Sequence, residues 1–179
     1  MTRKPLRSTS AATPVPAPKT QRKIFIRNRQ RAREVDLRQL RKLLRTLLEE
    51  LLAINTFELS LYLVSAKEIT RLNETFLRHR GATDVITFDY ADPPRSRALC
   101  GEIVVCLEEA VRQARRFRTT WRSELVRYVV HAVLHLRGYD DRRAKDRRHM
   151  KRAEDRLLRQ LVRSECALSK VARAPRLAG

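Results

Sequence analysis

The stretch FELSLYLVSAKEITRL, residues 57–72, decides the fold class, because it changes from the periodicity of a strand to that of a helix. Apolar residues alternate through Phe57–Val64, which is typical of a strand with one buried face. Ser65 and Glu68 then have the spacing of a capping box, which predicts a helix that continues to about Leu77. A strand followed at once by a helix indicates a chain that mixes both kinds of element.

The same patterns, followed outward from this stretch, predict one α+β domain. Upstream, residues 23–30 form a short strand, and the leucines of residues 37–52 recur at the three-to-four spacing of an amphipathic helix. Downstream, Gly81 is expected to end the helix, and further strands (84–90, 101–107) and helices (108–118, 121–137, 141–163) follow. The order β-α-β-α-β-β-α-α-α predicts a single mixed sheet of about four strands packed with about five helices.

The ends of the chain differ in composition from its middle. Residues 1–22 contain Pro5, Pro14, Pro16 and Pro18 and no acidic residue, so we expect a disordered basic extension. The prolines disfavour an organellar transit peptide, whereas a basic arm on RNA and a merely solvated tail both remain open. The predicted organisation is therefore a disordered extension (1–22), one folded domain (23–163) that would carry the function, and a flexible tail (164–179).

Cysteine usage and hydropathy predict the compartment. The three cysteines, Cys100, Cys106 and Cys166, show no C-x-x-C spacing, so they are expected to be small partly buried residues in a reducing environment. No segment approaches the ~18–20 apolar residues of a membrane helix. No apolar run follows the basic N-terminus as in a secretory signal. We expect a cytoplasmic protein without a membrane partner.

Charge predicts the class of partner. The chain has 40 Lys+Arg against 20 Asp+Glu, a formal net charge of +20. Nucleic acid is the commonest reason for such an excess, although a generally basic proteome is an alternative. Arginine greatly outnumbers lysine, which favours guanidinium contacts with phosphate over diffuse charge.

The segment VVHAVLHL, residues 129–136, carries the candidate metal ligands. His131 and His135 are four residues apart and therefore lie on one face of an otherwise apolar helix. Two buried imidazoles are costly without a partner, and a shared metal ion satisfies both. Gly138 lets the chain turn back, and Asp141 completes the pattern H-x3-H-x5-D. Satisfied core or surface histidines are the alternative, and His149 is expected to be such a surface residue.

Residue 132 distinguishes two kinds of hydrolysis. A zinc peptidase of the H-E-x-x-H type has a glutamate there as general base, whereas this chain has Ala132, which cannot transfer a proton. A metal can still lower the pKa of bound water towards ~7 and polarise a phosphoryl oxygen. The site therefore favours cleavage of a phosphodiester over cleavage of a peptide.

Three ordered blocks resemble the YbeY endoribonucleases. Residues 131–141, HAVLHLRGYDD, resemble the family signature H-G-x-L-H-L-x-G-Y-D-H. Leu72-Asn73 followed by residues 83–88, TDVITF, resembles the block L-N-x-x-(Y/F)-R … T-D-V-L-S-F. Residues 101–105, GEIVV, resemble the strand G-D-I-V-I. The similarity extends over roughly residues 23–160.

The resemblance implies a mixed sheet flanked by helices, one metal ion per chain, usually zinc, and cleavage of single-stranded RNA. It implies maturation of the 3′ end of 16S rRNA and ribosome quality control, with rRNA and the small ribosomal subunit as partners. His131 and His135 take the positions of metal ligands. The third position, a histidine in the family, holds Asp141 here, and this harder ligand can favour another transition metal.

The position of the family's catalytic arginine holds Leu77 here. Arg78, and less strongly Arg80, are the candidates to replace it, unless both belong to a solvated basic loop. Asp84 is a candidate proton acceptor or only caps the turn into its strand. The leading hypothesis is a metal-dependent endoribonuclease. A non-catalytic RNA-binding ribosome assembly factor with a structural metal is the alternative, and a metallopeptidase of reduced type is disfavoured by Ala132.

Overall fold

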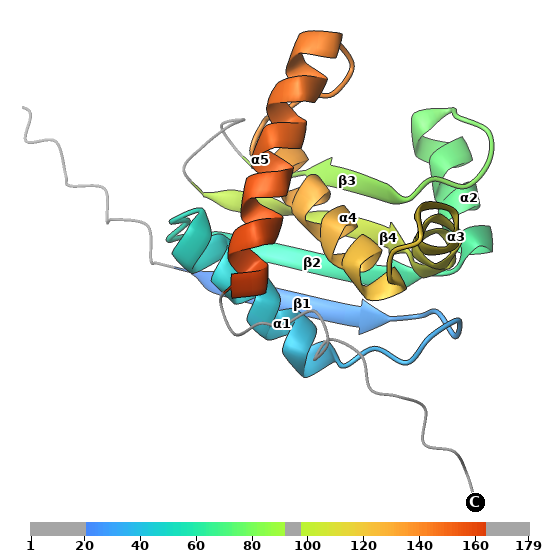
Figure 1. Ribbon diagram of the computed structural model, residues 1–179, viewed down its shortest axis with the longest axis horizontal. Coiled ribbons are helices and arrows are strands. Elements are labelled where there is room, and N and C mark those ends of the chain that lie inside the picture. Colours follow the sequence, from blue (N-terminus) through green and yellow to red (C-terminus); the bar gives the residue numbers. More distant parts are fainter. Residues whose placement is uncertain (1–20, 92–97, 164–179) are drawn as a thin grey trace, which may run out of the picture.

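The computed structural model describes residues 21–91 and 98–163, and Figure 1 shows their arrangement. The predicted tail over residues 164–179, Cys166 and almost all of the predicted extension lie outside these residues. The strands are β1 (Arg22–Asn28), β2 (Phe57–Val64), β3 (Val85–Asp89) and β4 (Leu99–Cys106). The helices are α1 (Leu37–Arg45), α2 (Ala66–Leu72), α3 (Leu107–Phe117), α4 (Trp121–Leu136) and α5 (Ala144–Arg163). Two π-helical turns, η1 (Thr46–Leu51) and η2 (Asn73–Leu77), extend α1 and α2.

The four strands form one mixed sheet in the order β1-β2-β4-β3. β1 pairs parallel with β2, and β2 pairs parallel with β4. β3 runs antiparallel to β4 and forms one edge of the sheet. The predicted α+β class, the order of elements and the mixed sheet are confirmed.

The two faces of the sheet are covered unequally. Figure 1 shows α1, α4 and α5 lying across one face. Leu59, Leu61 and Leu63 of β2 point into the large core beneath these helices and are fully buried. The alternate residues Tyr62 and Val64 point to the other face, where a smaller apolar cluster forms with α2. The sheet therefore has one deeply covered face and one that is covered only in part.

The helix after β2 begins at Ala66 and its helical turns continue to Leu77, as predicted, but Gly81 is not the residue that ends it. The Ser65 side chain accepts a hydrogen bond from the Glu68 backbone N–H at 3.3 Å, as in a capping box. The helix continues through η2 and ends at Arg78, whose φ of 57° is left-handed. The prediction that Gly81 ends it is wrong, because residues 74–80 are exposed and give a longer helix nothing to bury.

The last helix begins at Ala144, not at Asp141 as predicted. The Asp140 carboxylate accepts hydrogen bonds from the backbone N–H groups of Asp141 and Arg142, at 2.7 and 3.0 Å. These bonds hold the two residues in a turn, because a short acidic side chain competes with the helix for nearby donors. Asp141 consequently lies in the loop between α4 and α5.

α4 ends in a Schellman motif, as the glycine after it predicted. Gly138 has a φ of 84°, its N–H donates to the His135 carbonyl at 2.8 Å, and the N–H of Tyr139 donates to the Leu134 carbonyl at 3.0 Å. The turn sends the chain back past the histidines on the helix it has just left. None of the helices within the described residues is both long and apolar enough to cross a lipid bilayer.

Candidate metal centre

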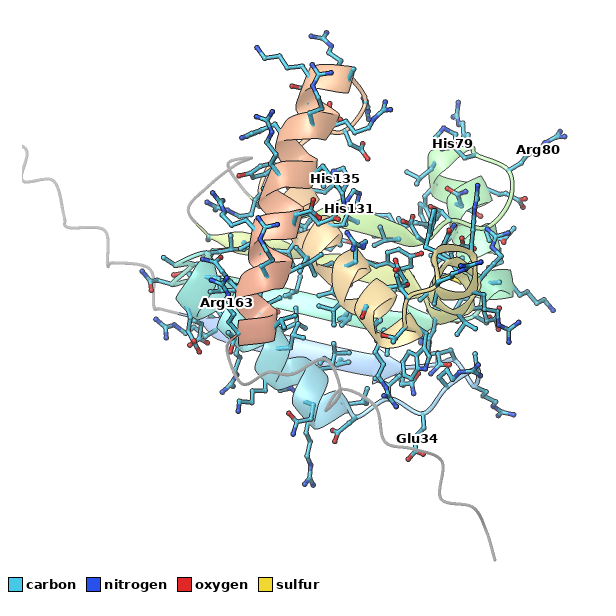
Figure 2. All side chains as sticks on the ribbon, viewed as in Figure 1. Glu34, His79, Arg80, His131, His135 and Arg163 are labelled. Atoms are coloured by element: carbon cyan, nitrogen blue, oxygen red, sulfur yellow. The ribbon has the colours of Figure 1, made fainter. Side chains whose placement is uncertain are left out.

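His131 and His135 lie on one face of α4, as their spacing predicted, and face each other below α5 (Figure 2). Their Nε2 atoms are 3.1 Å apart. Oδ2 of Asp141 lies 3.7 Å from Nε2 of His131 and 3.9 Å from Nε2 of His135. Three such donors can share one ion at the ~2.0–2.2 Å bond lengths of zinc. The structure thus brings the three predicted ligands together as a group that can hold a metal ion.

The outer nitrogens of the two rings have partners that fix where the protons sit. Nδ1 of His135 is 3.0 Å from the Tyr139 carbonyl oxygen, which only accepts, so Nδ1 carries the proton. Nδ1 of His131 is 3.1 Å from Oε2 of Glu154. An ionised carboxylate also only accepts, so Nδ1 of His131 carries the proton as well. In the neutral rings, both Nε2 lone pairs therefore converge with the Asp141 carboxylate. This donor set fits a cation.

Glu154 is the most buried acid next to the histidines, and it reaches them from α5. Its side chain is 6% exposed. Arg127 and Lys151 also contact its carboxylate, at 2.7 and 2.9 Å. Burial alone would raise the pKa of Glu154, but the hydrogen bonds from His131, Lys151 and Arg127 lower it to about 2. The carboxylate is therefore ionised and holds the His131 ring in one orientation.

The two imidazoles differ in their pKa. Burial lowers the pKa of His131, but the hydrogen bond with Glu154 and the charges of Glu154 and Asp84 raise it overall. Burial and the neighbouring His131 lower the pKa of His135. Asp141 raises the pKa of both rings through its charge, without reversing the direction for His135. The negative charge around the histidines thus comes from Glu154, Asp84 and Asp141, which lie in three different segments of the chain.

A cleft of about 400 Å³ opens beside the three ligands. Leu77, Asp84 and Arg142 are among the residues that line it, together with Thr83 and Thr87. Arg78 is not among them, because it follows Leu77 in a left-handed conformation. Figure 2 shows Arg80 at the tip of its loop, pointing away from His131 and His135. The structure therefore places the predicted replacement arginines outside the cleft that holds Leu77.

The side chain of Asp84 stabilises the turn that leads into β3. Its Oδ1 accepts hydrogen bonds from the Val85 backbone N–H at 2.9 Å and from the Thr83 hydroxyl at 3.1 Å. These bonds cap the turn into β3, as one of the two interpretations of the sequence proposed. The same residue also lines the cleft, so a role in proton transfer stays a prediction.

Sequence reasoning missed two residues of this site, Glu154 and Arg142. Arg142 was assigned to the basic helix, whereas it lies in the turn and lines the cleft. Glu154 carried a signal that could have been used, because it interrupts the apolar stripe of its helix. The buried residues of that stripe are Met150, Ala153, Glu154, Leu157 and Leu161. An acid in such a stripe needs a buried partner. His149, expected at the surface, is exposed and stacks on Tyr139 with ring centroids 5.1 Å apart.

Comparisons with known proteins identify similar sequences and similar solved structures. The model of a family described as "Endoribonuclease YbeY" matches residues 25–162. The Endoribonuclease YbeY of an Anaeromyxobacter species is 42% identical over 102 residues, which are 57% of this chain and 53% of that relative. That of Chlorobium luteolum is 43% identical over 93 residues, 52% of this chain and 66% of that relative. The chain thus spans about half to two thirds of the length of these two relatives.

A solved structure supports the same fold over most of the chain. The solution structure of TM1509 from Thermotoga maritima superposes with a TM-score of 0.59 at 27% sequence identity. The similarity covers 87% of this chain and 99% of that one. The two proteins therefore share a fold over most of this chain.

Proposed function

The chain belongs to the Endoribonuclease YbeY family, and on this premise we propose that it is a metal-dependent endoribonuclease acting on single-stranded RNA. One observation carries the metal-dependent part: Nε2 of His131, Nε2 of His135 and Oδ2 of Asp141 lie within 4.8 Å of one another. Partners on the outer nitrogens keep both lone pairs turned inward. Zinc, one ion per chain, suits two imidazoles and a carboxylate, although another transition metal is compatible with them.

Each residue of the cleft has a distinct part in the proposed reaction. His131, His135 and Asp141 would hold the ion, which would lower the pKa of a bound water and polarise a phosphoryl oxygen. Arg142 lies on the cleft wall, where its guanidinium can neutralise charge that develops on the phosphoryl oxygens. Asp84 lies on the same wall and accepts the proton of the attacking water through its carboxylate.

We further propose that the RNA is ribosomal, and that the protein acts in the cytoplasm. Maturation of the 3′ end of 16S rRNA and ribosome quality control are the cellular roles that family membership favours, with the small ribosomal subunit as partner. The net charge of +20 supports a polyanionic substrate. Cys100 and Cys106 are both free thiols, which agrees with a reducing compartment.

A metal analysis paired with RNA cleavage tests the proposal. We expect the protein, purified without added metal, to contain one transition metal ion per chain and to cleave single-stranded RNA. The double variant His131→Ala, His135→Ala should lose both properties. His79→Ala is the matched control, since His79 is an exposed histidine at the tip of a loop (Figure 2). An unchanged metal content in the double variant would contradict the assignment of the ligands.

Leu77 favours a second candidate function, that of a non-catalytic RNA-binding assembly factor with a structural metal. It lines the cleft at the position where the family has its arginine, and it has no hydrogen-bond donor to offer a phosphate. This alternative predicts a protein that binds metal and RNA and leaves the RNA intact. Detection of cleavage that depends on the histidines would exclude it.

A further inference from the structure

The less covered face of the sheet carries an aromatic pocket that the metal centre does not use. The pocket has a volume of about 430 Å³ and lies between the sheet and the segment α2–η2. Aromatic, aliphatic and charged side chains all line it. The lining includes four aromatic residues and two charged ones: Tyr62, Phe76, Phe88, Tyr90, Arg71 and Glu102.

The topology explains why aromatic rings are left open to solvent here. Tyr62 of β2 and Phe88 of β3 point away from the large core, and within residues 21–91 and 98–163 the segment α2–η2 packs against one part of their face. Phe76 of η2 meets the edge of Phe88, with ring centroids 5.6 Å apart and planes at 82°. Phe76 and Tyr90 nevertheless remain 60% and 56% exposed. Large rings grouped around a cavity and left this exposed mark a binding surface.

The charged groups of the pocket differ in whether a neighbouring side chain balances their charge. Glu102 of β4 lies among the rings, and its carboxylate can only accept hydrogen bonds. The guanidinium of Arg29 lies 5.1 Å from the centroid of the Tyr62 ring and pairs with Glu68 at 2.9 Å, so its charge is balanced. Arg71 also lines the pocket, and within the described part of the chain no acidic side chain forms an ion pair with it. The pocket thus offers aromatic rings, the carboxylate of Glu102 and the guanidinium of Arg71, which has no counter-ion among the described residues.

This combination fits a nucleobase attached to a phosphate. Every base has a flat face that can stack on aromatic rings, and this stacking tolerates any base. A carboxylate selects the base with two adjacent N–H donors, which is guanine on its Watson–Crick edge. Adenine and cytosine offer an amino group beside an acceptor nitrogen, and uracil offers one N–H between two carbonyl groups. The cation at Arg71 suits the phosphate.

The pocket and the metal cleft meet at the same two segments. Phe76 lines the pocket and the next residue, Leu77, lines the cleft. Thr87 likewise lines the cleft and the next residue, Phe88, lines the pocket. Because β3 is an edge strand, an RNA chain that leaves the cleft needs only to pass over this strand to reach the other face of the sheet.

We propose that the aromatic pocket is a guanine-binding subsite, which holds a base of the RNA strand a few nucleotides from the cleaved phosphodiester. The inference rests on the proposed function for the identity of the strand. The subsite would select where the metal centre acts, since it fixes the strand relative to His131 and His135 before cleavage. Binding of the base itself requires no metal and no reaction.

Binding of the four mononucleoside 5′-monophosphates to the full chain, measured by calorimetric or NMR titration, tests the subsite. The phosphate is common to all four, so a difference between them reports the base. We expect GMP to bind best, and Glu102→Gln to reduce its advantage about tenfold, because a bidentate contact contributes ~1–3 kcal/mol of discrimination. Tyr62→Leu should weaken all four. Phe25→Ala is the control, since Phe25 is 55% exposed and does not line the pocket.

Nucleotide binding at the pocket and RNA cleavage at the metal centre can be lost independently of each other. The variant His131→Ala, His135→Ala should keep its preference for GMP while losing RNA cleavage. If no cleavage is found in any variant but GMP still binds through Glu102, the proposed function fails and the subsite stands. Equal binding of the four nucleotides, an unchanged preference in Glu102→Gln, or capture of an apolar peptide in place of any nucleotide would overturn the subsite.

Discussion

Glu154 lies outside the predicted ligand set but orients the ring of one of its members, His131. It lies 23 residues beyond His131 in the chain and meets it only because α5 packs against α4. Its carboxylate fixes the proton on Nδ1 of His131, and this leaves the Nε2 lone pair available. A free ring in the same position would spend part of its time in the other tautomer or turned away.

We predict that Glu154→Gln weakens metal binding about 10–100-fold without removing a ligand. The amide cannot supply the negative charge that favours the required tautomer of His131. Competition with a chelator of known affinity measures the change. Asp155→Asn is the matched control, because Asp155 shares Lys151 and Arg127 with Glu154 and does not contact the ring. Equal affinities of the two variants would assign Glu154 to packing alone.

Arg142 lines the cleft beside the candidate metal ligands, so its guanidinium is the group proposed to contact the phosphate. Arg142→Ala should lower the rate of cleavage at saturating RNA by about 10²–10³, the usual cost of losing a group that stabilises transition-state charge. Arg78→Ala, the change that the sequence favoured, should have a smaller effect, because Arg78 does not line the cleft. The reverse order of effects would show that Arg78 moves into the cleft when RNA binds. Leu77→Arg should accelerate the reaction if the family arginine's function is missing.

The sequence allowed the three ligands to be predicted because their spacing is local. A helix places residues four apart on one face, and a glycine after the helix permits the return to Asp141. Glu154 and Arg142 could not be predicted in the same way. The first depends on how two helices pack, and the second on a hydrogen-bonded turn at Asp140 that competes with the start of a helix.

At the scale of elements, the turn between α4 and α5 has the greatest effect on the site. It supplies Asp141 as a candidate ligand, Arg142 as a wall of the cleft and the Tyr139 carbonyl as the partner of His135. All three depend on the direction in which the chain leaves α4. That direction is set by the positive φ of Gly138.

We predict that Gly138→Ala costs about 1–2 kcal/mol of stability, since a Cβ is strained in the left-handed region. It should also weaken metal binding, because the turn must adjust. Gly81→Ala provides the comparison: Gly81 has a similar φ of 89° and no atoms within 4 Å of the added carbon. Thermal unfolding should show a loss in both variants, whereas only Gly138→Ala should change metal affinity. Loss of metal affinity in both would point to a general loosening of the fold.

The ends of elements were the least predictable part of the fold. The segment after β2 has helical periodicity as far as Leu77, but from Glu74 onward its residues are exposed. Arg78 then takes the left-handed conformation that glycine usually takes, and the helix ends three residues before Gly81. Periodicity identifies which residues belong to a helix, whereas its last residue depends on what the neighbouring elements leave to bury.

At the scale of the whole molecule, the order and type of all the elements followed from the sequence. The alternation in β2 also predicted its buried face, because Leu59, Leu61 and Leu63 lie on one side of the strand and Glu58 and Ser60 on the other. What the sequence did not reveal is the aromatic pocket on the less covered face. That pocket depends on the pairing of β4 with β3, which brings Phe88 and Tyr90 close to Tyr62.

Charge predicts how the whole molecule binds its substrate. Affinity for single-stranded RNA should fall as salt rises, with a slope in the double-logarithmic plot of about −0.7 for each phosphate neutralised. Arg148, Arg152 and Arg156 lie exposed along α5, and changing them to Gln should make the slope shallower. Fluorescence anisotropy over a range of potassium chloride concentrations measures it. A slope near zero in the parent protein would remove RNA as the reason for the charge.

The position of β1 at the edge of the sheet has a practical consequence for anyone who concentrates this protein. Among the described residues β1 pairs with β2 alone, so its outer side offers unpaired backbone groups to a strand from another molecule. Lys23 and Arg27 point to the same face as the exposed Phe25 and repel an approaching copy. High salt weakens that repulsion while leaving the exposed ring unchanged. Salt added to strip nucleic acid from a preparation therefore also favours edge-to-edge aggregation.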